Sequence, residues 1–145
     1  MSRTLKEVTL DPSLWSDSDP VRPELGIDFK TAPGSGVYGL QDDDGAWKAF
    51  LCYARTTVVP TSVEELSELT NPAGQIMIPY TVWSLERGAG KEIISQVLAV
   101  AKKLGDVARV VTLSPLTKMA RKFHLKNDAV ELRVNEQTVN FEYKV

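Results

Sequence analysis

The first feature that could bind a ligand is a pair of glycines between an apolar segment and a helical pattern. The tripeptide Gly88-Ala89-Gly90 follows the apolar segment 76–83 and precedes apolar residues spaced at the helical period. A strand that enters a helix through such a turn leaves the first N–H groups of the helix free, with the positive end of the helix dipole behind them. The turn is therefore a candidate anion site suited to phosphate, and an ordinary tight turn is the alternative.

Two common nucleotide signatures are absent around this turn. The dinucleotide pattern Gly-x-Gly-x-x-Gly fails because Ile93 stands where its last glycine would be. The Lys-Ser or Lys-Thr pair of a phosphate-binding loop is also missing. The sequence thus predicts neither a dinucleotide site nor a nucleoside-triphosphate site.

The elements around the turn form a strand–helix–strand unit. The helical pattern runs from the turn to Gly105, a residue suited to a left-handed cap. A β-branched segment, 108–113, follows it. A connection of this length favours parallel strands joined by a right-handed crossover. The apolar residues that define the helix face are Ile93, Ile94, Val97, Leu98, Ala101 and Leu104.

Antiparallel strands are expected on both sides of this unit. Before it, the pattern predicts strands at 3–10, 37–40 and 46–57, the last two joined as a hairpin through an Asp-Gly turn. After it, Ser114-Pro115 is expected to begin a helix, and two strands at 129–134 and 138–143 close the chain. The sequence therefore predicts an α+β fold, with helices packed on a mixed, mostly antiparallel sheet.

Two polar segments are interpreted as surface features. Residues 16–23 are read as a loop on the surface, with a lid as the alternative. Asp42, Asp43 and Asp44 lack the further acidic ligands of a calcium loop, so a solvated turn is expected and no metal site is predicted.

Composition narrows the class of protein. The chain has 145 residues, which favours a single domain spanning 1–145, and 43% of them are hydrophobic. A net charge of −2 gives no general attraction to nucleic acid. The single cysteine, Cys52, excludes an internal disulfide and is expected to be buried. No segment is apolar enough to span a membrane and no signal-peptide core is evident, so a cytoplasmic location is expected.

The order of these elements resembles the Gcn5-related acetyltransferase (GNAT) fold, whose fourth strand and following helix bind the pyrophosphate of coenzyme A. The Gly88-Ala89-Gly90 turn matches that loop. The usual Gln or Arg three residues before the first glycine is Leu85 here, and Arg87 and Lys91 are the cations that can replace it. The resemblance implies a coenzyme A thioester bound by residues 87–91, with contacts from Trp83 and Ser84 at the end of the strand.

The half of the chain from Gln75 onward also resembles the catalytic domain of malonyl-CoA decarboxylases, which has this fold. The matching pieces are 78–84, 112–115, 123–129 and 139–143, and Phe-His-Leu-Lys-Asn-Asp-Ala at 123–129 is the most specific of them. The decarboxylases have glycine in place of Asp128, and they carry a long insertion between the second and third pieces that this chain lacks.

The resemblance implies a catalytic pair, because the decarboxylase serine and histidine correspond to Ser114 and His124. Loss of carbon dioxide from a malonyl thioester leaves an enolate, which needs a hydrogen-bond donor at oxygen and a proton at carbon. Thr112 is a rival hydroxyl on the same strand end. Helix capping is the alternative role for both Ser114 and His124. One continuous helix from Ser114 to His124 would also hold them about 15 Å apart.

Three functions follow from these observations. The first is an acyl-CoA enzyme most like malonyl-CoA decarboxylase, with either free coenzyme A or an acyl carrier protein as the thioester carrier. The second is an N-acetyltransferase, for which Glu64, Glu65 and Asp128 are loosely placed candidate bases. The third is a non-catalytic binding protein of this fold.

Overall fold

The computed structural model describes residues 3–145 and contains one eight-stranded sheet with four α-helices. The strands are β1 (Arg3–Glu7), β2 (Ser35–Asp42), β3 (Trp47–Thr56), β4 (Ile76–Ser84), β5 (Arg109–Val111), β6 (Ser114–Pro115), β7 (Val130–Val134) and β8 (Thr138–Tyr143). The α-helices are α1 (Ile27–Thr31), α2 (Val63–Leu69), α3 (Ala89–Leu104) and α4 (Lys118–Lys126). A short 3₁₀ helix, η1 (Pro12–Leu14), follows β1. None of the described helices is long and apolar enough to cross a membrane.

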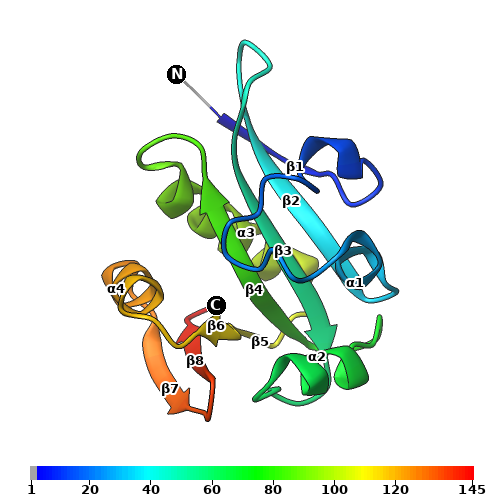
Figure 1. Ribbon diagram of the computed structural model, residues 1–145, viewed down its shortest axis with the longest axis vertical. Coiled ribbons are helices and arrows are strands. Elements are labelled where there is room, and N and C mark those ends of the chain that lie inside the picture. Colours follow the sequence, from blue (N-terminus) through cyan, green and yellow to red (C-terminus); the bar gives the residue numbers. More distant parts are fainter. Residues whose placement is uncertain (1–2) are drawn as a thin grey trace.

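The sheet has the order β1-β2-β3-β4-β5-β8-β6, and β7 pairs with the other edge of β8. All pairs are antiparallel except β4 with β5. That parallel pair, joined through α3, confirms the predicted strand–helix–strand unit. Figure 1 shows β1–β4 as one long twisted half of the sheet, with β5–β8 and α4 as a second half turned away from it.

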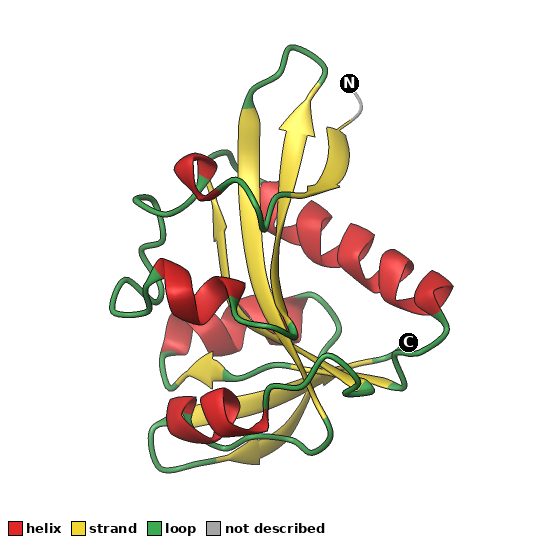
Figure 2. Cartoon of the chain, turned by 90° about the vertical axis from the view of Figure 1, so that its right-hand side faces the viewer, coloured by secondary structure: helices red, strands yellow, loops and turns green. Residues whose placement is uncertain are grey.

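The two faces of the long half of the sheet are covered by different elements. The apolar stripe of α3, including Ile93 and Val97, packs on one face against Leu51 and Met77. Trp15 and residues of α1 and α2 pack on the opposite face. Figure 2 shows the long helix α3 on one side of the sheet and shorter helices on the other. The nearly continuous burial along β2, β3 and β4 follows from this, because successive side chains point to opposite faces and both faces are covered.

Strands β4 and β5 diverge soon after they pair. They share two pairs, Ile76 with Arg109 and Met77 with Val110, before their paths separate. Within β4, Tyr80 has no partner on β3, where the register shifts between Cys52 and Tyr53. Such a bulge adds twist to a strand. The end of β4 is therefore carried away from β5 and β6, which opens the sheet at its centre.

The predicted helix is present as α4, but its predicted start at Ser114-Pro115 is wrong. These two residues form β6, which pairs with β8 through Val139 and Thr138, and the helix begins at Lys118 behind a Thr117 cap. Pairing with a strand distant in sequence thus outweighs the local capping signal. Helix α1 was not predicted, and it places Lys30 inside the protein.

Several local predictions are confirmed. Gly105 ends α3 in the left-handed region at a φ of 75°. The hairpin between β2 and β3 turns at Gly45, whose φ is 91°. Cys52 is fully buried, as expected.

Candidate functional site

A cavity of about 320 Å³ lies where the two halves of the sheet separate. Its walls come from the end of β4, the turn into α3, β6, α4 and the loop before α1. The cavity is lined by Pro20, Val21, Pro79, Tyr80, Thr81, Val82, Trp83, Ser84, Gly90, Ser114, Pro115, Thr117, Met119, Ala120, Phe123 and His124. Its volume lies within the range of about 300–1,000 Å³ typical of small-molecule sites.

His124 enters the cavity from α4 and is only 6% exposed. Its ring stacks on Phe141, with centroids 5.1 Å apart, and its Nδ1 lies 2.7 Å from the Tyr143 hydroxyl oxygen. Burial lowers the pKa of His124 from 6.5 to about 4, so the imidazole is neutral at pH 7.

The hydrogen bond to Tyr143 fixes which ring nitrogen carries the proton. Tyr143 is 2% exposed, and Nδ1 of His124 is the one acceptor that the described chain offers its hydroxyl hydrogen. A buried hydroxyl without an acceptor costs about 1–3 kcal/mol, so Tyr143 donates and the neutral imidazole carries its hydrogen on Nε2. Nε2 has no partner among residues 3–145 and is the ring atom left for a ligand.

Ser114 lines the same cavity from β6 and shares a hydrogen bond with Thr112. The two hydroxyl oxygens are 2.7 Å apart, and Thr112 Oγ1 also accepts the Phe141 N–H at 3.1 Å. Thr112 is 1% exposed and does not line the cavity. Its hydroxyl hydrogen is therefore directed at Ser114, which leaves the Ser114 hydrogen free to donate into the cavity. Thr112 orients Ser114.

The Gly88-Ala89-Gly90 turn has the geometry of an open helix N-terminus. Gly88 precedes α3 with a φ of 84°, and no side chain within the described range 3–145 caps the helix. The Ala89 N–H donates to Glu86 O, and Glu92 is the first residue to bond within the helix, to Gly88 O. The N–H groups of Gly90 and Lys91 lie between these two and belong to the open first turn.

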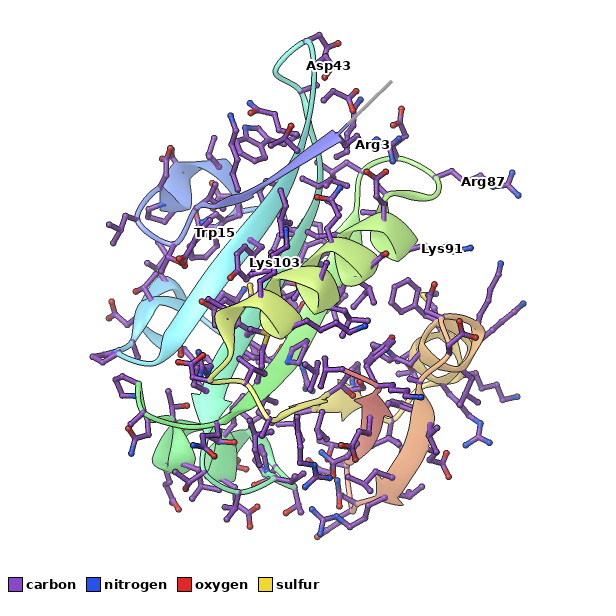
Figure 3. The ribbon with its side chains drawn as sticks, turned by 180° about the vertical axis from the view of Figure 1, so that it is seen from behind. Arg3, Trp15, Asp43, Arg87, Lys91 and Lys103 are labelled. Atoms are coloured by element: carbon purple, nitrogen blue, oxygen red, sulfur yellow. The ribbon has the colours of Figure 1, made fainter. Side chains whose placement is uncertain are left out.

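The other predicted contacts flank this turn. Trp83 and Ser84 both line the cavity, with Trp83 buried and Ser84 exposed. Figure 3 shows Arg87 and Lys91 projecting outward from the start of α3, and no carboxylate among residues 3–145 pairs with either. Gly90 lies against α4, because a Cβ there would be 3.2 Å from Phe123.

The prediction that the loop before α1 is a surface excursion is wrong, because Asp19 and Arg22 are buried. The Asp19 carboxylate, with its side chain 1% exposed, lies 2.7 Å from the Lys30 ammonium group. It also accepts hydrogen bonds from the Thr81 hydroxyl and the backbone N–H groups of Val21 and Arg22. These bonds hold Pro20 and Val21 in place as a wall of the cavity.

Arg22 spans the split between the strands. Its guanidinium donates to Tyr80 O of β4 at 3.4 Å and to Leu113 O at 3.0 Å. These two carbonyl groups lie where β4 and β5 no longer pair with each other. The buried Arg22 side chain therefore supplies the hydrogen bonds that strand pairing would otherwise give them. The proline and aspartate at 19–20 indicate a turn, but no local sequence signal reveals these distant partners.

Comparison with known proteins identifies the fold of this chain through solved structures, but it finds no match at the level of sequence. No family model matches the sequence, and no curated protein matches it. Among solved structures, the GphF GNAT-like decarboxylase in complex with isobutyryl-CoA aligns with a TM-score of 0.74 at 15% identity, covering 97% of this chain and 98% of that one. PaiA N-acetyltransferase from Thermoplasma acidophilum, in complex with coenzyme A, aligns at 0.67 and 10% identity over the full length of both chains.

Malonyl-CoA decarboxylase from Agrobacterium vitis aligns with a TM-score of 0.67 at 18% identity over 83% of this chain. This chain covers only 35% of that decarboxylase, about a third of its length. The alignments confirm that the chain has the GNAT fold and that its architecture is similar to that of the decarboxylases.

Proposed function

We propose that this GNAT-fold chain binds an acyl-CoA in the central cleft and decarboxylates a malonyl-type thioester. The observation that carries the proposal is that His124 and Ser114 line one cavity. The helix that would have held them about 15 Å apart begins only at Lys118, so Ser114 lies on a strand across the cavity from α4.

The proposed roles of Ser114 and His124 follow from which hydrogen atoms their side chains can donate. The bond from the malonyl carbon to its carboxylate breaks, carbon dioxide leaves, and the electron pair moves into the thioester carbonyl as an enolate. Ser114, oriented by Thr112, donates its free hydrogen to the enolate oxygen. His124 then gives a proton to the enolate carbon, which yields acetyl-CoA.

The neutral state of His124 before substrate binds is compatible with these reaction steps. The malonyl carboxylate brings a negative charge into a cavity that no described Asp, Glu, Lys or Arg side chain lines. An opposite charge nearby favours the imidazolium, so substrate binding raises the pKa of His124 from about 4. Tyr143 supports both forms, because its hydroxyl can donate to neutral Nδ1 and accept from the protonated nitrogen.

The described lining offers no carboxylate base for acyl transfer to an amine. Acyl transfer needs a group that accepts the amine proton, whereas decarboxylation needs no base. Of the candidate bases, Glu65 accepts hydrogen bonds from Thr61, and neither Glu64 nor Asp128 lines the cavity.

The start of α3 would bind the pyrophosphate of the thioester carrier. The open N–H groups of Gly90 and Lys91 and the unpaired cations of Arg87 and Lys91 supply donors and positive charge. Trp83 and Ser84 would then contact the pantetheine arm between the turn and the catalytic pair.

Calorimetric titration with coenzyme A, acetyl-CoA and malonyl-CoA tests the proposed cleft. The proposal expects binding of all three, with net proton uptake only for malonyl-CoA, detected by repeating the titration in buffers of different ionisation enthalpy. Absence of binding for all three would reject coenzyme A recognition. Binding without proton uptake would reject the role of the malonyl carboxylate in charging His124.

A further inference from the structure

Strand β7 lies at one edge of the sheet and offers its outer side to another molecule. Figure 1 shows β7 at the outer end of the second half of the sheet, beyond β8. Within residues 3–145 it pairs with β8 alone, so the backbone N–H and C=O groups along its other side have no strand partner there. Such an edge is ready to pair with a strand of another chain.

The side chains of β7 add apolar surface to this edge. Val130, Leu132 and Val134 occupy alternate positions and are 68%, 44% and 56% exposed. Val130 and Leu132 also line a hollow of about 390 Å³ beside the strand, which extends to Val145. An exposed apolar strand next to such a hollow is typical of a surface that another protein covers.

The sequence of β7 is complementary to itself. In an antiparallel pair of two β7 strands centred on Leu132, each Val130 faces the partner's Val134, and the two Leu132 side chains face each other. Each Glu131 then faces the partner's Arg133, and the two-fold axis repeats this opposite-charge pair. Strand β8 leaves Leu132 unmatched, because its register with β7 shifts between Glu131 and Arg133.

This charge pattern specifies the register of the pair. A shift by one residue would set Glu131 against the partner's Val134 and Leu132 against the partner's Arg133, which loses both the apolar and the charged matches. Arg133 is exposed and forms no ion pair within the described residues. The Glu131 carboxylate pairs with Arg121 of α4, yet its side chain is 32% exposed and a carboxylate can accept from more than one donor.

We propose that two copies of this chain pair through β7, which joins their sheets into one continuous antiparallel sheet across a two-fold axis. The partner's Val134, facing Val130, would lie at the hollow beside β7, and the same contact recurs on the other side of the axis. The inference does not depend on the proposed function, because neither β7 nor this hollow contributes a residue to the lining of the central cleft.

Sedimentation velocity over about 1–200 µM protein tests this pairing, and the wild-type chain is expected to change from monomer to dimer in that range. The Glu131→Lys variant places a cation opposite the partner's Arg133, and the Arg133→Glu variant places two carboxylates opposite each other. Each is expected to dimerise about tenfold more weakly than the wild type. An equimolar mixture of the two variants restores both opposite-charge pairs and is expected to dimerise about as tightly as the wild type.

Two controls separate edge pairing from other effects of these changes. Glu68→Lys makes the same change of charge on α2, and Arg121→Ala removes the partner of Glu131 within the chain without altering β7. Both are expected to keep wild-type association. Leu132→Asp, which leaves both ion-pairing residues in place, is expected to weaken association and is the variant to use if a charge-reversed chain fails to fold.

Three outcomes would overturn the proposal. The first is a wild-type chain that stays monomeric at the highest concentration. The second is a mixture of the two charge variants that associates no better than either variant alone. The third is an equal weakening by Arg121→Ala, because the effect of Glu131→Lys would then come from its contact with α4.

Discussion

The buried, neutral state of His124 predicts how the stability of the protein depends on pH. His124 is the only histidine in the chain, and burial lowers its pKa from 6.5 to about 4. Between these values the unfolded chain binds a proton that the folded chain does not, so stability falls as the pH falls. From the difference in pKa, His124 alone removes about 2 kcal/mol of unfolding free energy between pH 7 and pH 5, and about 3 kcal/mol once the pH is below 4.

Urea denaturation of the wild-type chain and of His124→Gln at half-unit steps from pH 7.5 to pH 4 measures this contribution. Glutamine preserves a polar side chain of similar length and cannot titrate. The difference between the two unfolding free energies is expected to shrink by about 2 kcal/mol from pH 7 to pH 5. A difference that stays constant across this range would refute a buried neutral imidazole, whatever the absolute stability of the variant.

Three further variants probe single contacts. Tyr143→Phe removes the donor to Nδ1 of His124 and is expected to lower kcat for malonyl-CoA about tenfold with little change in KM. ¹⁵N NMR of this variant is expected to show that the imidazole no longer prefers its hydrogen on Nε2. An unchanged tautomer would contradict the proposed hydrogen bond from Tyr143. Asp128→Gly is expected to stabilise the fold by about 1 kcal/mol in chemical denaturation, because Asp128 has a φ of 72° that glycine adopts freely; a loss of stability would be the opposite result. Lys30→Met is expected to lower the free energy of unfolding by about 3–5 kcal/mol, because it leaves Asp19 buried without its cation. Adding Asp19→Asn is expected to recover part of that loss in chemical denaturation. Equal stabilities of the single and double variants would argue against a strong ion pair.

The parts of the fold that the sequence predicts are those set by neighbouring residues. The apolar period of α3, the left-handed Gly105 that ends it and the β2–β3 hairpin all arise from contacts within a few residues. The parallel pairing of β4 and β5 follows from the length of the connection between them.

The errors come from contacts between distant parts of the chain. Ser114 has the signal of a helix cap, yet its segment pairs with β8 around Val139. Asp19 appears in a polar loop, but its charge is buried because Lys30 from α1 reaches it. Neither partner could be identified from spacing alone, since many arrangements of the chain would satisfy the same local pattern.

The candidate site was predicted by residue type and by resemblance, while its geometry required the structure. Resemblance singled out Ser114 and His124, but only the fold places them on one cavity. The tautomer of His124 and the direction of the Ser114 hydroxyl depend on Tyr143 and Thr112. Thr112, the rival hydroxyl in the sequence, lies behind Ser114 and outside the cavity lining, which supports a positioning role.

Turnover of malonyl-CoA in deuterium oxide, followed by mass spectrometry, tests the central claim most directly. The wild-type chain is expected to release carbon dioxide and form acetyl-CoA with one deuterium, and His124→Gln is expected to lose this activity while still binding coenzyme A. Intact malonyl-CoA after incubation with the folded wild-type chain, or equal turnover by His124→Gln, would contradict the account.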